Sequence, residues 1–350
     1  MAEYVDALCR EMMMRDSQHS IRTIYLGGGT PSQLSPALLE KLFYNIYNVY
    51  KVEEDAEVTI ECNPDDVTDS FVASLALLPV NRVSLGAQTF DDEQLRFLKR
   101  RHTSKQVSEA VGRLRQHGIG NISIDLMFGF PNETLAEWES DIEKALALDV
   151  EHISAYSLMY EEGTPLNEWK NQMHIAEDEE LSRAMYETLI DRLTTAGFEH
   201  YEISNFARKT SNGQNWRSRH NSSYWHETPY IGLGAAAHSY DRKTRSWNVA
   251  DVQQYIRCIT DGVLAIEDTE LIDDITRYND LVTTALRTCD GIALNELLKH
   301  LPPKFHQYLL DSAAKSISCG LLAVTDGHLH LTRNGLFVSD DVMSDLIYVV

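Results

Sequence analysis

The sequence predicts an α/β protein: a partial barrel of the TIM type that lacks its first strand, followed by a small α+β domain of winged-helix type. Over residues 1–205, short β-rich runs alternate with amphipathic helical patterns, which is typical of parallel sheets with helical crossovers. The series begins with a helix that no strand precedes, which indicates that the first barrel strand is missing. From about residue 267, helical patterns precede a single hairpin.

The elements of the barrel follow in order along the chain. Tyr4, Leu8 and Met12 recur at helical spacing among charged residues, so the chain begins with an amphipathic helix. Apolar, β-forming runs predict strands at residues 23–29, 57–64, 82–89, 121–129 and 152–160. Amphipathic patterns predict helices at residues 37–50, 70–78, 104–118, 134–149 and 177–197.

After about residue 200 the pattern changes. Residues 201–240 are irregular and rich in aromatic side chains, which predicts a loop region over residues 206–265. Helical patterns then lie around residues 270–287, 291–301 and 304–318, before a hairpin whose turn is Asp326 and Gly327. We therefore expect three parts, namely a partial barrel (1–205), the loop region (206–265) and a winged-helix-like domain (266–350).

The acidic composition limits the partners that the chain can have. Lysine and arginine total 31 against 53 aspartates and glutamates, which gives a net charge of −22 at pH 7. Such a surface repels nucleic acid, so nucleic acid is a poor candidate partner. No apolar run reaches the ~20 residues of a membrane-spanning helix, and the first helix lacks the features of a signal peptide. We therefore expect a cytoplasmic protein and not an integral membrane protein.

A glycine-rich turn, Gly27 to Pro31, ends the first predicted strand and precedes a helix that Ser35 and Pro36 can begin. Because consecutive glycines carry no side chains, backbone N–H and C=O groups of such a turn can approach a ligand closely. Glycine-rich turns are also common as plain connections in α/β proteins. The turn alone therefore leaves a ligand site and an ordinary connection open.

Polar residues stand near the ends of three successive apolar strands, at Glu61, Gln88 and Asp125. Barrel strands are buried on both faces, so packing gives no reason for a carboxylate or an amide there. The carboxyl ends of parallel strands face one mouth of the barrel, which predicts a binding site for a ligand with hydroxyl groups and a positive centre. Any one of these acids alone could instead cap a helix or join an ion pair.

Five motifs stand in series along the chain, namely GGGTPSQL, IECNPDD, VSLGAQTFDDEQLRFLKRRH, SIDLMFGFPNET and YSLMYEEGTPL. In this order and spacing the chain resembles the radical SAM coproporphyrinogen dehydrogenase-like family over essentially its whole length. The resemblance implies an S-adenosylmethionine (SAM) site made of Gly28, Gly29, Thr30, Glu61, Gln88, Arg100 and Asp125. The neighbouring Arg101 could take the place of Arg100 in this site. Without the resemblance, both arginines are better interpreted as the solvated basic end of a helix.

The family contains oxygen-independent coproporphyrinogen III oxidases and HemW-type heme chaperones. The HNSSYW segment at residues 220–225 resembles the HNxxYW heme motif of the HemW type, so the resemblance implies a chaperone that binds heme and passes it to acceptor proteins. The implied heme residues are His220, Asn221, Tyr224 and Trp225. A neutral His220 imidazole can ligate heme iron, and the aromatic rings can pack on the porphyrin. From spacing alone, the aromatic residues could instead plug the barrel beside a merely hydrogen-bonded histidine.

The family holds a 4Fe-4S cluster on three cysteines of a CxxxCxxC loop, and this chain contains no such loop. Its five cysteines are far apart, at Cys9, Cys62, Cys258, Cys289 and Cys319. Each is expected to be a small buried residue. We therefore expect a truncated chain or a relative without the cluster, unable to cleave SAM reductively. Three alternatives also stay open, namely an oxygen-independent coproporphyrinogen III oxidase, an inactive SAM-binding scaffold, and a dimer formed through the exposed sheet edge.

Overall fold

The computed structural model describes residues 1–15, 19–160, 162–163, 167–168, 170, 178–210 and 213–349. The chain divides into two compact units. The first comprises residues 1–24, 34–57 and 218–350, and the second comprises residues 25–33 and 58–217. Over the described part of the chain, no helix combines the length and the apolar composition that a membrane span requires.

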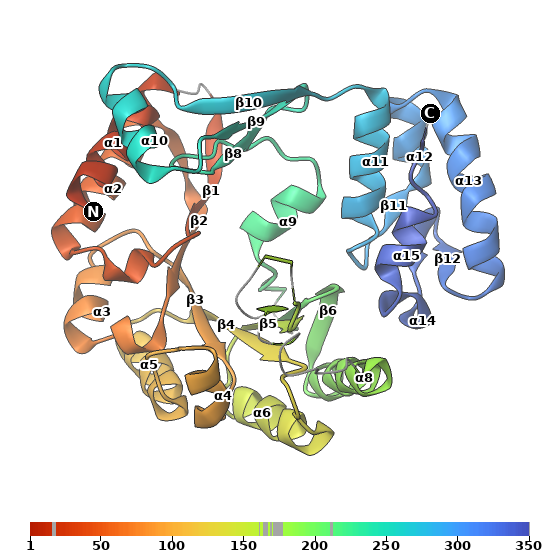
Figure 1. The fold of residues 1–350 in the computed structure, drawn as a ribbon, viewed down its shortest axis with the longest axis horizontal. Helices are drawn as coiled ribbons and strands as arrows, with labels where there is room; N and C mark the ends of the chain where they lie inside the picture. The colour runs from red at the N-terminus through yellow and green to blue at the C-terminus, as the bar shows by residue number, and fades with distance from the viewer. Residues whose placement is uncertain are drawn as a thin grey trace. The chain divides into compact units, whose positions relative to one another are not determined.

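A seven-stranded sheet with the order β1-β2-β3-β4-β5-β7-β6 forms the barrel (Figure 1). Its strands are β1 (Ser20–Leu26), β2 (Lys51–Cys62), β3 (Arg82–Gln88), β4 (Asn121–Phe128), β5 (His152–Ser157), β6 (Phe198–Glu202) and β7 (Asn205–Arg208). Strands β2 to β5 pair in parallel, whereas β7 is antiparallel to β5 and to β6. Because β1 and β6 stand at opposite ends of this order, the described strands form a partial barrel. The predicted α/β fold is confirmed.

Two features of this sheet differ from the prediction. Strand β2 begins at Lys51 rather than at Glu57, because its first residues are polar and mostly exposed and so carry no apolar signal. Strands β6 and β7 form an antiparallel hairpin at the end of the sheet where no strand was predicted. Each has at most five residues, and Glu199, His200 and Glu202 interrupt the apolar pattern of β6.

Helices pack on the outer side of β3 to β6 (Figure 1). They are α3 (Asp69–Leu75), α4 (Asp92–Phe97), α5 (Ser104–Gln116), α6 (Leu135–Ala147) and α8 (Glu179–Thr195). Short 3-10 turns, η1 (Pro31–Gln33) and η2 (Pro64–Asp66), follow β1 and β2. The buried residues of α5 recur at the spacing of one helical face, at Val107, Ala110, Val111 and Leu114. Capping boxes at Thr103 and Thr134 define where α5 and α6 begin.

The first unit contains three further groups of elements. One group comprises α1 (Ala2–Met14), α2 (Pro36–Val49) and α10 (Val252–Thr260), and another is α9 (Arg219–Trp225) with the sheet of β8 (His238–Tyr240), β9 (Thr244–Asn248) and β10 (Ile266–Leu271). The C-terminal group comprises α11 (Asp274–Ala285), β11 (Ile292–Ala293), α12 (Leu294–His300), α13 (Pro303–Ser318), β12 (Leu322–Thr325), β13 (His328–Leu331), α14 (Arg333–Leu336) and α15 (Ser339–Ser344). Its predicted hairpin is present, with positive φ at both Asp326 and Gly327 as a tight turn requires.

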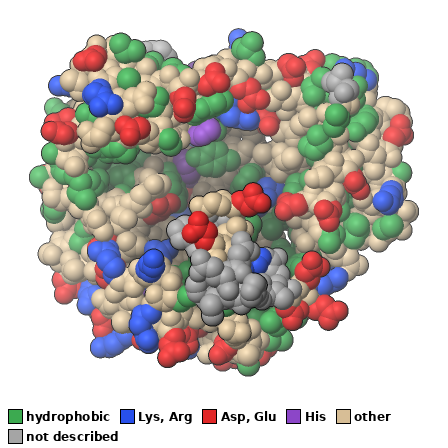
Figure 2. All heavy atoms as spheres, in the orientation of Figure 1, with side chains coloured by type: hydrophobic (Ala, Val, Ile, Leu, Met, Phe, Trp, Pro, Cys, Tyr) green, Lys and Arg blue, Asp and Glu red, His purple; other side chains and the backbone are tan. Residues whose placement is uncertain are grey.

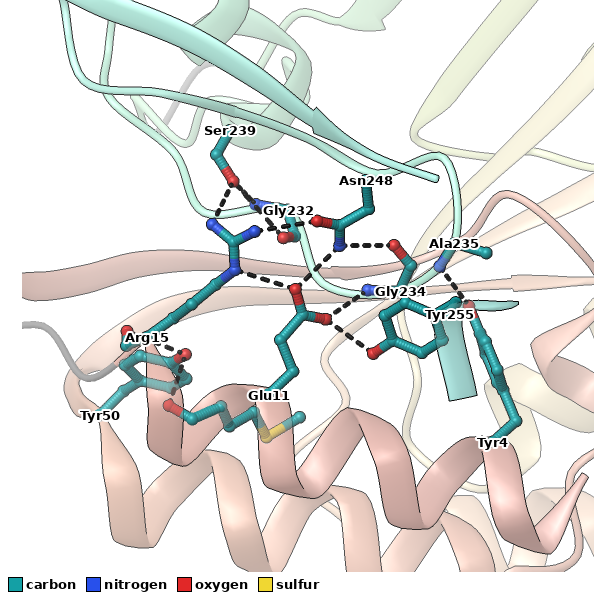
Figure 3. A network of polar contacts seen from close by, with 11 residues as sticks. Tyr4, Glu11, Arg15, Tyr50, Gly232, Gly234, Ala235, Ser239, Asn248 and Tyr255 are labelled. Atoms are coloured by element: carbon teal, nitrogen blue, oxygen red, sulfur yellow. Dashed lines mark hydrogen bonds and ion pairs between the residues drawn. The ribbon is translucent and has the colours of Figure 1, made fainter. Parts of the chain in front are cut away.

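A buried carboxylate joins α1 to residues that lie more than two hundred positions away in the sequence (Figure 3). Glu11 is fully buried. Its oxygens accept hydrogen bonds from the side chains of Arg15, Asn248 and Tyr255 and from the backbone N–H of Gly234. Arg15 and Asn248 also bond to each other at 2.9 Å. Each of these contacts satisfies a polar group that would otherwise be buried without a partner.

Candidate functional site

The glycine-rich turn is fixed to strand β2 by Glu61. The Gly28 N–H donates to one carboxylate oxygen at 3.1 Å, and the Tyr25 hydroxyl donates to the other at 2.7 Å. A Cβ at Gly27 would lie 2.4 Å from the Tyr25 ring and 2.7 Å from the Glu61 carboxyl, so only glycine fits there. Gly28 and Gly29 differ from Gly27, because a Cβ at either position would meet nothing within 4 Å. Their backbone is therefore open to a ligand.

Asp125 lies on the inner face of β4, between buried residues that pack against the helices. The Ser84 hydroxyl lies 3.2 Å from both carboxylate oxygens. Burial, together with the nearby charge of Glu61, raises the pKa of Asp125 to about 6. Two carboxyl groups thus share one end of the strands, and a ligand with a positive centre would relieve their mutual repulsion.

The two candidate arginines have different surroundings. Arg100 donates to the side-chain oxygen of Asn63 at 3.4 Å, and the charges of Asp125 and Asp65 oppose the lowering of its pKa by burial. Arg101 has a side chain that is 53% exposed, and it pairs with Asp65 at 3.2 Å and with Asp66 at 3.0 Å. Of the two, Arg100 is therefore the one that interacts with the half-buried carboxyl of Asp125.

Gln88 and Thr30 complete the set that the sequence predicted. Gln88 is buried at a register shift of β3 and has a φ of 66°, a conformation that few non-glycine residues adopt. Thr30 is exposed at the end of the glycine-rich turn. The second unit contains all seven predicted SAM residues. Carboxylates, one guanidinium and an open backbone turn are the groups that an aminoacyl nucleoside with a positive centre requires, so the residues present fit SAM.

The HNSSYW segment forms helix α9 rather than the irregular stretch that its composition predicted. Ser218 caps the helix, because its hydroxyl accepts the Asn221 N–H at 3.2 Å. The buried carboxylate of Glu57 accepts the N–H groups of Arg219 at 3.0 Å and His220 at 2.9 Å. These contacts satisfy the N–H groups of the first turn, which explains why so short a helix forms. Glu57 was not predicted, because it follows a run of polar residues at the start of the predicted strand and nothing in the sequence distinguishes it from them.

Both ring nitrogens of His220 are hydrogen-bonded. Nδ1 lies 3.1 Å from the Thr23 hydroxyl, and Nε2 lies 2.9 Å from the Tyr224 hydroxyl. Burial lowers the pKa of His220 to about 4, so the imidazole is neutral at pH 7. A neutral imidazole is the form that can ligate a metal. The surroundings of His220 therefore favour the form of the imidazole that can ligate a metal.

Aromatic rings extend from His220 along one side of α9. The Tyr224 ring stands edge-on to the imidazole at 5.0 Å and to the Tyr230 ring at 4.8 Å. Tyr224 is 38% exposed, and burial raises its pKa to about 12. The Trp225 indole lies 5.5 Å from the Arg287 guanidinium, and its N–H has no hydrogen-bond partner among the described residues. These rings offer apolar area to a flat ligand.

The cysteines do not fit a 4Fe-4S cluster. Among the described residues, no group of three histidines, cysteines or acids is placed to hold a metal ion. Cys9 and Cys62 are buried as expected, but Cys289 and Cys319 are exposed, so the expectation of burial is wrong for these two. Cys319 caps the end of α13 and Cys289 lies in a turn. Part of the YSLMYEEGTPL motif, at residues 161 and 164–166, lies outside the described residues.

Acidic side chains are distributed over the face shown in Figure 2, in agreement with the net charge of −22. This face carries basic side chains as well, and they stand among the acidic ones. The electrostatic field of a negatively charged protein does not attract polyanions.

Comparison with known proteins identifies the family. Residues 3–145 match the radical SAM superfamily, and residues 272–338 match the HemN C-terminal domain. The chain is 35% identical to the heme chaperone HemW of Bacillus subtilis, over 97% of this chain and 90% of that protein. It is 32% identical to the heme chaperone HemW of Lactococcus lactis, over 98% of this chain and 89% of that protein.

The solved structure of coproporphyrinogen III oxidase (HemN) from Escherichia coli, a radical SAM enzyme, superposes with a TM-score of 0.84. The superposition covers all of this chain and 83% of that one at 18% identity, which shows the fold alone. The predicted partial barrel and the C-terminal domain are thus confirmed as this fold. Together with the sequence identities above, these matches show that the chain belongs to the HemW family of the radical SAM superfamily.

Proposed function

We propose that this chain is a heme chaperone that binds heme on helix α9 and passes it to acceptor proteins. The observation that carries the proposal is the half-buried, neutral imidazole of His220, which stands beside the exposed ring of Tyr224. The imidazole supplies an iron ligand, and the aromatic side chains supply apolar area for the porphyrin. Relatives that share a third of their residues with this chain are named heme chaperones, which supports the same function.

A titration with hemin tests this proposal. We expect a saturable shift of the Soret band with the unaltered chain, and a loss of affinity of at least tenfold in His220→Ala, since a metal ligand is removed. His226→Ala is a matched control, because His226 ends the same helix but its side chain is 56% exposed. Hemin affinity that is unchanged in His220→Ala, with the helix content retained, would overturn the proposal.

We further propose that SAM binds at the carboxyl ends of β1 to β4, held by Gly28, Gly29, Thr30, Glu61, Gln88, Arg100 and Asp125. When bound, SAM supplies a sulfonium centre and an aminoacyl group. The carboxylates of Glu61 and Asp125 complement positive charge, and Arg100 complements a carboxylate.

The neighbouring arginines provide a direct test of the SAM site. We expect Arg100→Ala to weaken SAM binding about tenfold or more in calorimetry, because a half-buried charge that faces the ligand is lost. Arg101→Ala should change the affinity by less than twofold, because that side chain is 53% exposed and is already paired with Asp65 and Asp66. Equal effects of the two substitutions would show that the site is not the one proposed.

A further inference from the structure

The imidazole of His220 is held from two sides within the first unit. Thr23, on the inner face of β1, contacts Nδ1 at 3.1 Å. Tyr224, one turn further along α9, contacts Nε2 at 2.9 Å and stands edge-on to the ring. The strand and the helix therefore fix both the plane and the direction of the imidazole, before any ligand is present.

These contacts also select one tautomer. A neutral imidazole carries one N–H donor and one acceptor nitrogen. The phenol of Tyr224 is the more acidic hydroxyl, so it is the better donor, and Nε2 accepts from it. Nδ1 then carries the hydrogen and donates it to the Thr23 oxygen. In this tautomer the Nε2 lone pair points at the Tyr224 hydroxyl, which occupies the position that a metal ion would take.

We propose that Thr23 is a positioning residue that prepares Nε2 of His220 to ligate heme iron, and that the Tyr224 hydroxyl is a placeholder which moves away when iron binds. This inference rests on the proposed function of His220. It follows from the geometry, because a histidine ligand commonly donates its second N–H to a protein acceptor, which fixes its tautomer and raises its basicity. Thr23 is the acceptor at that nitrogen.

The hydroxyl of Thr23 can be removed with little change of shape. We expect Thr23→Val to lower hemin affinity about tenfold, the usual effect of losing such an acceptor. Valine is β-branched like threonine, so strand β1 should tolerate it. Thr23→Ser keeps the oxygen and should restore affinity to within about twofold of the unaltered chain. Should the valine variant fail to fold, Thr23→Ala also lacks the hydroxyl and provides the same comparison.

The Tyr224 hydroxyl should have the opposite effect. Tyr224→Phe keeps the aromatic ring but removes the bond to Nε2 that iron must displace. We expect hemin to bind about fivefold more tightly, the equivalent of one neutral hydrogen bond that no longer has to be broken. Binding that is unchanged or weaker in this variant would overturn the placeholder role.

A spectroscopic readout separates positioning from mere folding. In the ferrous heme complex, the iron–histidine stretching frequency reports on the hydrogen bond at Nδ1, because that bond makes the imidazole a stronger donor to iron. We expect the resonance Raman frequency to fall in Thr23→Val and to return in Thr23→Ser. Thr59→Val is the matched control, since Thr59 is fully buried on β2 and its hydroxyl has no partner among the described residues.

The outcomes distinguish this inference from the proposed function. If His220→Ala binds hemin like the unaltered chain, the proposed function fails and this inference fails with it. If His220→Ala loses hemin but Thr23→Val keeps both the affinity and the stretching frequency, the positioning role alone is wrong. A fall in affinity that Thr59→Val shares, with no change of frequency, would likewise assign Thr23 a structural role only.

Discussion

Glu11→Ala is expected to lower the free energy of unfolding by about 4 kcal/mol, because it removes one partner from a buried ion pair and leaves several polar groups unpaired. The Arg15 side chain is only 13% exposed, and its ion-pair partner is fully buried. Without the carboxylate, the guanidinium of Arg15, the amide of Asn248 and the hydroxyl of Tyr255 each lose an acceptor. Asn248 and Tyr255 are buried, so water cannot replace their bonds without a large cost in free energy.

Urea unfolding followed by circular dichroism measures this effect. The midpoint should fall while the slope of the transition stays constant, since the surface exposed on unfolding is unchanged. Glu3→Ala, at an exposed position in the first turn of the same helix, should change stability by less than about 0.5 kcal/mol. Tyr255→Phe should cost about 1 kcal/mol alone and almost nothing once Glu11 is gone. Full additivity of the two substitutions would contradict a shared network.

Much of the barrel could be predicted because each element carries a local signal. In β4, Ile122, Ile124 and Leu126 are fully buried and alternate with the polar residues Asn121, Ser123 and Asp125, so these eight residues alone predict the strand. The helix that begins with the Thr134 capping box is equally local. The Glu11 network could not be predicted in this way, because nothing near Glu11 in the sequence distinguishes it from a solvated helical glutamate. Its partners come from residues 234–255, and only the tertiary fold brings them to it.

The same contrast between local signals and tertiary contacts applies to the candidate site. Glu61 and Asp125 were predicted from their place at strand ends, and the structure adds that Glu61 also holds the glycine-rich turn. The residues that support His220 were missed, because each lies in a strand distant in sequence. Thr23 and Glu57 have ordinary β-strand contexts, and their roles follow only from the position of α9. A sequence motif therefore identifies the residues that contact a ligand, but it does not identify the residues elsewhere in the chain that position them.

Asp125→Asn is expected to raise the free energy of unfolding at pH 7 by about 2 kcal/mol while it weakens SAM binding. Burial raises the pKa of Asp125 from 3.8 to about 6, so the folded chain holds this proton more tightly than the unfolded chain does. The free energy of unfolding therefore falls as the pH rises from about 4 to about 6. Each unit of pKa difference corresponds to roughly 1.4 kcal/mol, and partial solvent access of the carboxyl reduces the total to about 2 kcal/mol. Asparagine stays neutral and keeps an oxygen for Ser84.

The free energies of unfolding of the unaltered chain and of Asp125→Asn should be compared across pH, since their difference isolates Asp125 from the other groups that titrate. Burial also raises the pKa of Glu133, to about 7, but that group is present in both chains and cancels in the difference. The gain in stability of Asp125→Asn should thus be absent below pH 4 and complete above pH 6. Asp69→Asn, whose side chain is 80% exposed, should show no such step. A sulfonium ligand would neutralise the same charge that destabilises the folded chain. A stabilised variant that still bound SAM normally would therefore remove Asp125 from the site.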